Sequence, residues 1–127
     1  GRSHVRMPSL DDAALQQELC ESRERLSSLL GHNINSIAYP YGEHDERVRS
    51  AAAACGYTYG FTTAAGSSAA SEDLLRIRRL TIEGGDRPAA FARKLAFATN
   101  DGGWRPLAGY LVGKLGKLGK LPGARNR

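Results

Sequence analysis

The sequence has 127 residues, of which 41% are hydrophobic and 24% charged, so it can form one globular domain with a core. No apolar run approaches the roughly 20 residues that a membrane-spanning helix needs. The net charge of +5 comes from the C-terminal part, where six basic residues and no acid follow Asp101: Arg105, Lys114, Lys117, Lys120, Arg125 and Arg127. Residues 1–104 hold the other basic residues and all 13 acids, so they lack the basic surface of a nucleic-acid-binding domain, and we expect no nucleic acid partner.

The first predicted element is a helix over about residues 10–30. Ser9 followed by Asp12 resembles a capping box, and apolar residues then recur at helical spacing: Leu15, Leu19, Leu26, Leu29 and Leu30. Gly31 is expected to end the helix in the left-handed conformation, and His32 just after it suits the negative end of the helix dipole. We expect this helix to cover one face of a sheet.

A strand, a helix and a second strand follow with short connections. The β-prone run at residues 34–39 must end at Pro40, which has no N–H to give to a ladder. Asp45 suits a helix N-cap, an alanine-rich helix runs up to Gly56, and residues 57–62 are aromatic and β-branched. This order predicts a βαβ unit with parallel strands. Ligands meet such units at the carboxyl ends of the strands, which makes the loop that begins at Pro40 a candidate site.

The region after the βαβ unit is predicted to hold a loop, a third strand and a further helix. Residues 64–73 are small and polar, and residues 75–82 alternate as a strand does until Arg78 and Arg79 interrupt the pattern. The arginine pair indicates a bulge or a charged sheet edge, or, for Arg79 alone, a functional group. Asp86 as N-cap, with a proline in the first turn, opens the last helix. The mixture of helices and strands favours an α/β fold.

The C-terminal part, residues 101–127, has a different character. It contains three copies of Gly-Lys-Leu, and a period of three does not keep one face of an α-helix. One interpretation is a mobile basic tail, and the other is weak contact with an anionic membrane or polymer surface. We therefore expect a domain at residues 1–100 and a basic tail at residues 101–127.

Two cysteines, Cys20 and Cys55, fall in separate predicted helices and lack the spacing of metal ligands. Each is most simply a small buried hydrophobic residue, and the sequence does not show whether the two lie close enough for a disulfide. Neither a reducing nor an oxidising compartment is excluded, so both cytoplasm and cell envelope remain open.

Three segments, taken in order, carry the functional signal. They are Gly-Arg-Ser-His-Val-Arg-Met-Pro-Ser-Leu at residues 1–10, Ser-Ile-Ala-Tyr-Pro-Tyr-Gly at residues 36–42 with a Gly-Tyr strand after its helix, and Leu-Arg-Ile-Arg-Arg-Leu-Thr-Ile at residues 75–82. Together they resemble the polysaccharide deacetylases of the NodB-homology type, which are carbohydrate esterases. That family has a His-x-x-x-His motif, a Phe-Ala-Tyr-Pro-Tyr-Gly region and, in one branch, a Leu-Pro-Arg-Ile segment. A lone Pro-Tyr-Gly is weak evidence, whereas the ordered set is specific.

The resemblance implies a distorted (β/α) barrel and a hydrolase that removes N-acetyl or O-acetyl groups from a polysaccharide or oligosaccharide. It also implies a divalent metal, usually zinc, held by one aspartate and two histidines, because a metal lowers the pKa of bound water and polarises the carbonyl. His4 matches the second of these histidines. Tyr41 matches the residue whose backbone N–H holds the developing oxyanion, and Arg79 matches an arginine that orients the catalytic base.

The other residues of the central loop are candidates for substrate contact: Tyr39, Pro40, Gly42 and His44. Pro40 rigidifies the turn next to Tyr41. Two interpretations of His44 stay open, a contact with the sugar or a solvated loop residue. Tyr39 is expected either in the core or in the wall of a pocket.

The sequence departs from the family pattern in ways that bear on activity. The family's Asp-Asp motif and first metal histidine would precede Gly1, and no histidine-bearing strand follows Arg79 to supply the general acid. Ala38 stands where many members have an arginine, a role that Arg79 could take over. We therefore expect the C-terminal portion of a deacetylase domain, partnered by its N-terminal half and catalytically inactive without it. The alternatives are a non-catalytic carbohydrate-binding remnant using the central loop, or a membrane- or polymer-attached interaction module using the tail.

Overall fold

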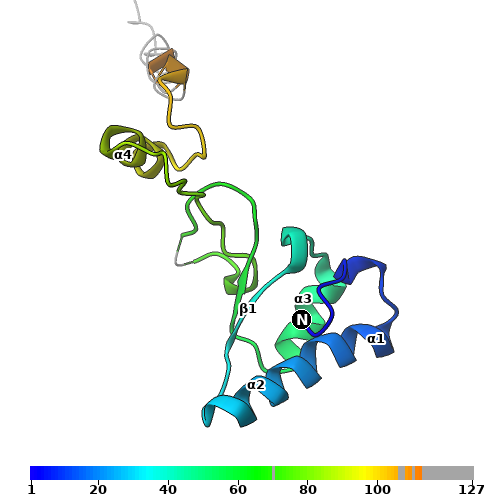
Figure 1. Ribbon diagram of the computed structural model, residues 1–127. Helices are drawn as coiled ribbons and strands as arrows, with labels where there is room; N and C mark the ends of the chain where they lie inside the picture. The colour runs from blue at the N-terminus through cyan, green and yellow to red at the C-terminus, as the bar shows by residue number, and fades with distance from the viewer. Residues whose placement is uncertain (70, 106–107, 110, 113–127) are drawn as a thin grey trace, which may run out of the picture. The chain divides into compact units, whose positions relative to one another are not determined.

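The computed structural model describes residues 1–69, 71–105, 108–109 and 111–112 (Figure 1). The chain divides into two compact units, residues 1–80 and residues 81–127. The helices and parallel strands of the first unit agree with the predicted α/β class. The three Gly-Lys-Leu copies, and with them the proposed membrane contact, lie outside the described residues. Among the helices that are described, none is long and apolar enough to cross a membrane.

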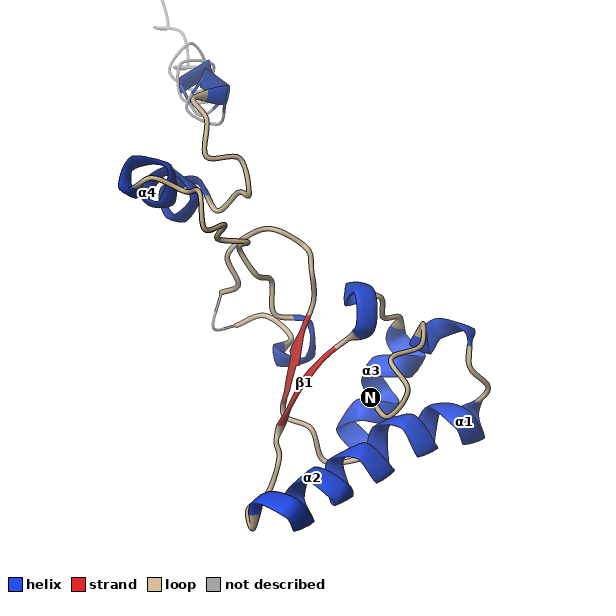
Figure 2. Cartoon of the chain, in the orientation of Figure 1, coloured by secondary structure: helices blue, strands red, loops and turns tan. Residues whose placement is uncertain are grey.

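The predicted βαβ unit is confirmed and forms the centre of the first unit. Figure 2 shows β1 (Ser36–Ala38) and β2 (Tyr59–Phe61) side by side; they pair in parallel, with Ile37 opposite Gly60, and α3 (Glu46–Ala54) connects them. Asp45 caps α3 as predicted, because its carboxylate accepts a hydrogen bond of 2.8 Å from the Val48 amide. After α3, Gly56 has the predicted left-handed conformation, with φ of 91°.

The long first helix is also confirmed, with a later start than predicted. It consists of α1 (Asp12–Gln16), a π-helical turn η2 (Gln17–Glu21) and α2 (Ser22–Leu30), and Gly31 ends it with φ of 70°. Its N-cap is Asp11, whose carboxylate accepts a hydrogen bond from the Ala14 amide; Ser9 belongs instead to a separate 3-10 turn, η1 (Met7–Ser9). The predicted capping by His32 is confirmed by a 3.0 Å contact between its Nδ1 and the Leu30 carbonyl oxygen.

The core lies between this helix, α3 and the strands. Its buried apolar residues come from η1, the first helix, β1, α3 and the positions next to the strands: Met7, Leu15, Leu19, Ile37, Tyr39, Val48, Ala52 and Tyr57. The second half of the helix does not take part, because Leu26, Leu29 and Leu30 on α2 are 45%, 72% and 57% exposed. The expectation that the whole apolar stripe covers a sheet is therefore wrong for α2, because these three leucines stay exposed.

The third strand predicted at residues 75–82 does not form. A 3-10 turn, η4 (Leu74–Arg76), stands at its start, and only Ile77 pairs, in a parallel bridge with Phe61. The turn is favoured locally because the Asp73 carboxylate accepts a hydrogen bond of 2.9 Å from the Leu75 amide.

Cys20 and Cys55 form a disulfide, with their Cα atoms 5.0 Å apart. The simplest interpretation of the sequence, two separate buried thiols, is therefore wrong. The bond joins the π-helical turn of the first helix to the C-terminal end of α3. It thus links the two helices that enclose the core.

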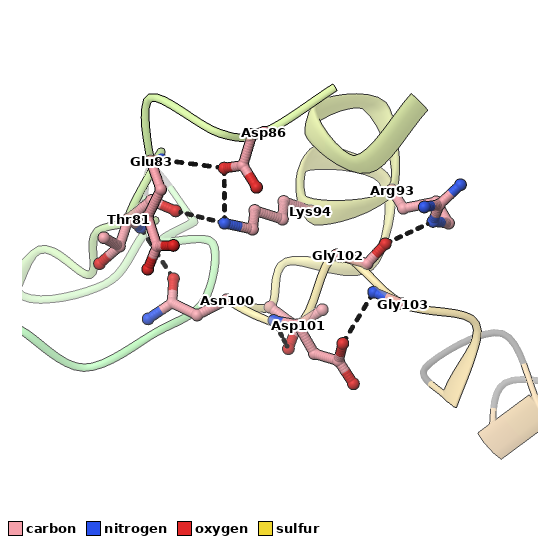
Figure 3. A network of polar contacts seen from close by, with 10 residues as sticks. Thr81, Glu83, Asp86, Arg93, Lys94, Asn100, Asp101, Gly102 and Gly103 are labelled. Atoms are coloured by element: carbon pink, nitrogen blue, oxygen red, sulfur yellow. Dashed lines mark hydrogen bonds and ion pairs between the residues drawn. The ribbon is translucent and has the colours of Figure 1, made fainter. Parts of the chain in front are cut away.

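The second unit is organised by a buried lysine on α4 (Pro88–Phe97). Lys94 is 4% exposed, and its Nζ donates hydrogen bonds to the Asp86 carboxylate at 2.6 Å and to the Thr81 carbonyl oxygen at 3.0 Å (Figure 3). Hydrogen bonds from Lys94 and then from the Glu83 amide lower the pKa of Asp86. Asp86 was predicted to cap α4, but the N-cap residue is Arg87, because the Asp86 carboxylate is committed to Lys94 and Glu83.

Candidate functional site

The loop after β1 has an unusual backbone at Tyr41. A 3-10 turn, η3 (Pro40–Gly42), follows the strand, and within it Tyr41 adopts φ of 58° and ψ of 5°. This left-handed conformation is rare for a tyrosine and costs roughly 1–3 kcal/mol, so such residues concentrate at functional sites. Gly42 is also left-handed, with φ of 74°. The predicted site therefore lies on a strained turn at the carboxyl end of a parallel strand.

Of the two backbone polar groups of Tyr41, the carbonyl oxygen is hydrogen-bonded within the described residues and the N–H is not. Its carbonyl oxygen accepts a hydrogen bond of 3.1 Å from the Thr63 hydroxyl, which lies just after β2. Its backbone N–H makes no hydrogen bond to any of the described residues, and its side chain is 56% exposed. The turn is thus held from one side and leaves one backbone donor uncommitted.

The N-terminal segment meets this loop. The His4 ring contacts the Tyr41 ring edge-on, with their centroids 5.3 Å apart, and the Arg6 guanidinium lies 4.9 Å from the centroid of the same ring. Arg6 also forms an ion pair with Glu43. Two residues that the sequence separates widely, His4 and Tyr41, are therefore brought together.

Glu18 anchors the segment that carries His4. The Glu18 carboxylate is 8% exposed and accepts hydrogen bonds from the backbone amide of Ser3, at 2.9 Å, and from the Ser3 hydroxyl. Burial acts to raise the pKa of Glu18, but the hydrogen bonds from Ser3, together with the Arg2 backbone and the charge of the N-terminus, lower it below its usual value. His4 itself has φ of 56°, so the chain turns sharply at this residue.

Tyr39 and His44 form the inner wall of the loop. Their rings stack with centroids 5.1 Å apart, and His44 Nδ1 lies 3.0 Å from the Gly42 carbonyl oxygen. Tyr39 is 2% exposed, and its hydroxyl donates a 2.8 Å hydrogen bond to the Leu75 carbonyl oxygen. Burial, assisted by Asp73, raises the pKa of Tyr39 to about 12. Tyr39 thus supports His44 from within the core.

Two further predicted site residues lie near the loop. Pro40 is buried beneath it. Arg79 lies on the segment after Ile77, where its Nε donates a 2.6 Å hydrogen bond to the Thr62 carbonyl oxygen and its amide bonds the Ala64 carbonyl oxygen. The described part of the chain shows no hydrogen bond or ring contact between Arg79 and the loop residues. Arg79 therefore braces the end of β2.

The residues present do not by themselves fit a metal centre. No group of three or more His, Cys, Asp or Glu side chains lies close enough to hold a metal ion among the residues that the structure describes. His4 is a single imidazole against an aromatic ring, whereas a protein zinc site uses three or four ligands. We therefore derive no chemical step through a metal from this chain.

Sequence reasoning missed the residues that hold the loop in place. Arg6, Glu18 and Thr63 fix the loop or the histidine segment beside it. Each of these contacts joins residues at least 15 positions apart, so no local sequence pattern predicts them. The glycine at position 42 was the available signal for Thr63, because an added Cβ there would lie 2.5 Å from the Thr63 amide nitrogen.

Comparison with known proteins gives the same family as the motifs. Residues 1–60 match the family model described as polysaccharide deacetylase. The structure is similar to the Streptococcus pyogenes deacetylase PplD in complex with acetate, with 27% identity and a TM-score of 0.67, over 71% of this chain and 40% of that one. It is also similar to BC0361, a polysaccharide deacetylase from Bacillus cereus, with 26% identity and a TM-score of 0.65, over 72% of this chain and 29% of that one.

None of the curated proteins matches the sequence significantly. The family match ends before residues 75–82, so it does not cover the segment that holds Arg79. The chain spans 40% or less of the length of the two deacetylases named above. The predicted resemblance is confirmed: this chain is similar to the polysaccharide deacetylases in residues 1–60 by sequence, and over about seven-tenths of its length by structure.

Proposed function

We propose that this chain forms part of the active site of a polysaccharide deacetylase, a hydrolase that removes acetyl groups from N-acetylated or O-acetylated sugars. The observation that carries the proposal is the Tyr41 turn. Its strained backbone leaves an N–H without a partner among the described residues, at the carboxyl end of β1 and beside His4. An oxyanion is best stabilised by donors that are fixed before the reaction, and this donor is fixed by η3 and Thr63.

In this proposal each residue of the loop has a separate task. The Tyr41 N–H donates to the oxygen of the acetyl carbonyl as charge develops on it. His44 contacts the sugar, while Pro40, Gly42 and Tyr39 hold the turn and the histidine in place. Arg79 orients the catalytic base, which the family's Asp-Asp motif would supply. The terminal nitrogens of the Arg79 guanidinium make no hydrogen bond with the described residues, so they are available for that contact.

His4 is proposed as one ligand of a divalent metal, zinc by family preference. It provides one of the three ligands that the family's site requires, and this chain supplies no cluster for the others among its described residues. We also propose that the complete domain is the (β/α) barrel of the NodB-homology type, of which the βαβ unit is one repeat.

The test is acetate release from oligomers of N-acetylglucosamine. We expect the 127-residue chain alone to release no more acetate than its His4→Ala variant, because one imidazole does not hold a catalytic metal. The coding DNA upstream of Gly1 should place a histidine immediately before it and an Asp-Asp motif further upstream in the same frame. Acetate release by the chain alone above the His4→Ala level would contradict the predicted inactivity, and an upstream sequence without those residues would contradict the deacetylase role.

A second candidate function is carbohydrate binding without catalysis. It is favoured by the exposure of the Tyr41 side chain, 56%, since exposed aromatic rings offer an apolar face and a polar edge to a ligand. In this case the chain binds an N-acetylglucosamine oligomer with no dependence on metal. Binding that persists in a metal chelator, with no acetate released by the longer reading frame, would favour this function over the first.

A further inference from the structure

A basic hollow adjoins the candidate site and shares His44 with it, but its two arginines have no role in the function proposed above. It has a volume of about 200 Å³ and is lined by five residues: His44, Thr62, Ala64, Arg76 and Arg78. They come from the loop after β1, the end of β2 and the segment that begins in η4. Two arginines and a histidine therefore line a hollow to which no acidic residue contributes among the described residues, and we call it the arginine hollow.

The two guanidinium groups of the arginine hollow are not used by the fold. Neither Arg76 nor Arg78 donates a side-chain hydrogen bond or forms an ion pair within the described part of the chain. The nearest acid along the sequence, Asp73, is ion-paired with Arg49 instead. Arg76 acts on Asp73 only at longer range, as a small contribution to its lowered pKa, after the Leu75 amide and Arg49. Within the described part of the chain, these two exposed arginines therefore lie close together and neither forms an ion pair.

The rest of the hollow is held in position. Thr62 is 2% exposed, and its hydroxyl donates to the Ile77 carbonyl oxygen at 3.3 Å and accepts from the Ala64 amide at 3.2 Å. His44 is held by a hydrogen bond that its Nδ1 donates to the Gly42 carbonyl oxygen, and by the stacking of its ring on Tyr39. The stem of Arg78 passes close to Gly66, where an added Cβ would come within 2.6 Å of Arg78 Cδ. These contacts therefore hold the lining of the hollow in a defined position.

We propose that the arginine hollow binds an oxyanion, either a carboxylate or a phosphate. The planar guanidinium group matches both anions with paired hydrogen bonds, and two such groups can donate to one anion together. The volume is below the roughly 300–1,000 Å³ of pockets that enclose a drug-sized ligand, so it suits a substituent rather than a whole sugar chain. The identity of the ligand rests on the proposed function: the anion is an acidic group of the polymer, next to the acetylated sugar at Tyr41.

The experiment uses the full 127-residue chain labelled with ¹⁵N and follows backbone amide shifts. Three probes are titrated: inorganic phosphate, a neutral N-acetylglucosamine tetramer, and a tetrasaccharide in which N-acetylglucosamine alternates with glucuronic acid. Each is added to the wild type, to Arg76→Gln/Arg78→Gln, and to the control Arg25→Gln/Arg87→Gln. The control removes the same two charges from exposed arginines that lack ion pairs among the described residues.

We expect phosphate to shift the amides near His44 and Thr62, and the Arg76→Gln/Arg78→Gln variant to bind phosphate about tenfold more weakly, with little change in the control. We expect the acidic tetrasaccharide to bind more tightly than the neutral one, and that preference to disappear in the same variant. If phosphate binds in this way but both tetrasaccharides bind equally or not at all, the hollow still binds oxyanions and the ligand is a free anion, whatever the fate of the deacetylase proposal. Equal weakening of phosphate binding in both double variants, or no phosphate binding, would overturn the inference.

Discussion

Replacing Gly42 with alanine should destabilise the chain more than the same change at Gly31. Both glycines are left-handed, with φ of 74° at Gly42 and 70° at Gly31. A methyl group at Gly31 meets nothing within 4 Å, whereas one at Gly42 would lie against the Thr63 hydroxyl and 2.5 Å from the Thr63 amide nitrogen. That nitrogen belongs to the backbone that follows β2, so it cannot rotate away as a side chain can. The pair of variants therefore separates the cost of the backbone angle from the cost of the overlap.

The magnitudes follow from these two contributions. A left-handed angle costs an L-residue roughly 1–2 kcal/mol, of which about 0.4–1 kcal/mol is recovered because alanine has fewer unfolded conformations than glycine. Both variants carry this net cost. Overpacking adds roughly 1–3 kcal/mol, and only Gly42→Ala incurs it. The free energy of unfolding should therefore fall about 1–3 kcal/mol further in Gly42→Ala than in Gly31→Ala.

Urea unfolding followed by circular dichroism measures this difference. The midpoints convert to free energies provided that the slopes with urea are the same in the wild type and both variants. Equal destabilisation by the two substitutions, or a larger loss for Gly31→Ala, would refute the packing of the site loop against Thr63. The same result would remove the support for a fixed Tyr41 N–H, since Thr63 also holds the Tyr41 carbonyl oxygen.

Three further predictions concern the disulfide and two titrating groups. Removing the Cys20–Cys55 bond, which spans 35 residues, should lower the free energy of unfolding by roughly 4 kcal/mol, because the unfolded chain gains conformational freedom. A urea midpoint that reductant leaves unchanged would contradict this. The pKa of Tyr39 is raised from 10.0 to about 12, so its contribution to the free energy of unfolding should be fully present below pH 10 and be lost as the pH rises toward 12. Tyr39→Phe should make this alkaline loss of stability shallower, and an identical alkaline slope in the variant would count against the prediction. The pKa of Glu18 is lowered from 4.5, so its contribution to the free energy of unfolding should be fully present above pH 4.5 and be lost at lower pH. Glu18→Gln should remove part of this acid loss of stability, whereas Glu24→Gln, at an exposed glutamate, should not. Equal pH profiles of the two variants would argue against the anchoring role of Glu18.

Local signals in the sequence were sufficient for the βαβ unit and for the position of its loop. The Asp45 cap, the stop at Gly31 and the proline that ends β1 each act within a few residues, so the pattern and the structure agree. The family motifs added the functional meaning of Tyr41 and His4, which composition and spacing do not contain. The contact between these two residues is consistent with that meaning, although their roles stay predictions.

The failures have a common physical cause, which is that they depend on partners far away in the chain. Residues 75–82 have strand-like composition, but a strand needs a neighbour, and only Ile77 finds one. The apolar stripe of the first helix is regular, but none of the described residues covers its second half, as Leu29 at 72% exposure shows. The Cys20–Cys55 disulfide depends on the packing of two helices, which the cysteine spacing does not reveal.

The barrel implied by the resemblance stays a prediction, since the described residues form a sheet of two strands. The related deacetylases named above are at least twice as long as the region they share with this chain, in line with coverages of 40% and 29%. The division of the sequence into a domain at residues 1–100 and a tail at residues 101–127 stays a prediction.

The central claim is that the Tyr41 turn and His4 belong to one deacetylase site, and acetate release by the protein that the longer reading frame encodes tests it most directly. His4→Ala is compared with His32→Ala, which removes an exposed imidazole that only contacts the end of its own helix. The account predicts that His4→Ala loses activity by at least about 100-fold, the effect of losing a metal ligand or its support, while His32→Ala keeps it. Equal activity in the two variants would contradict the claim.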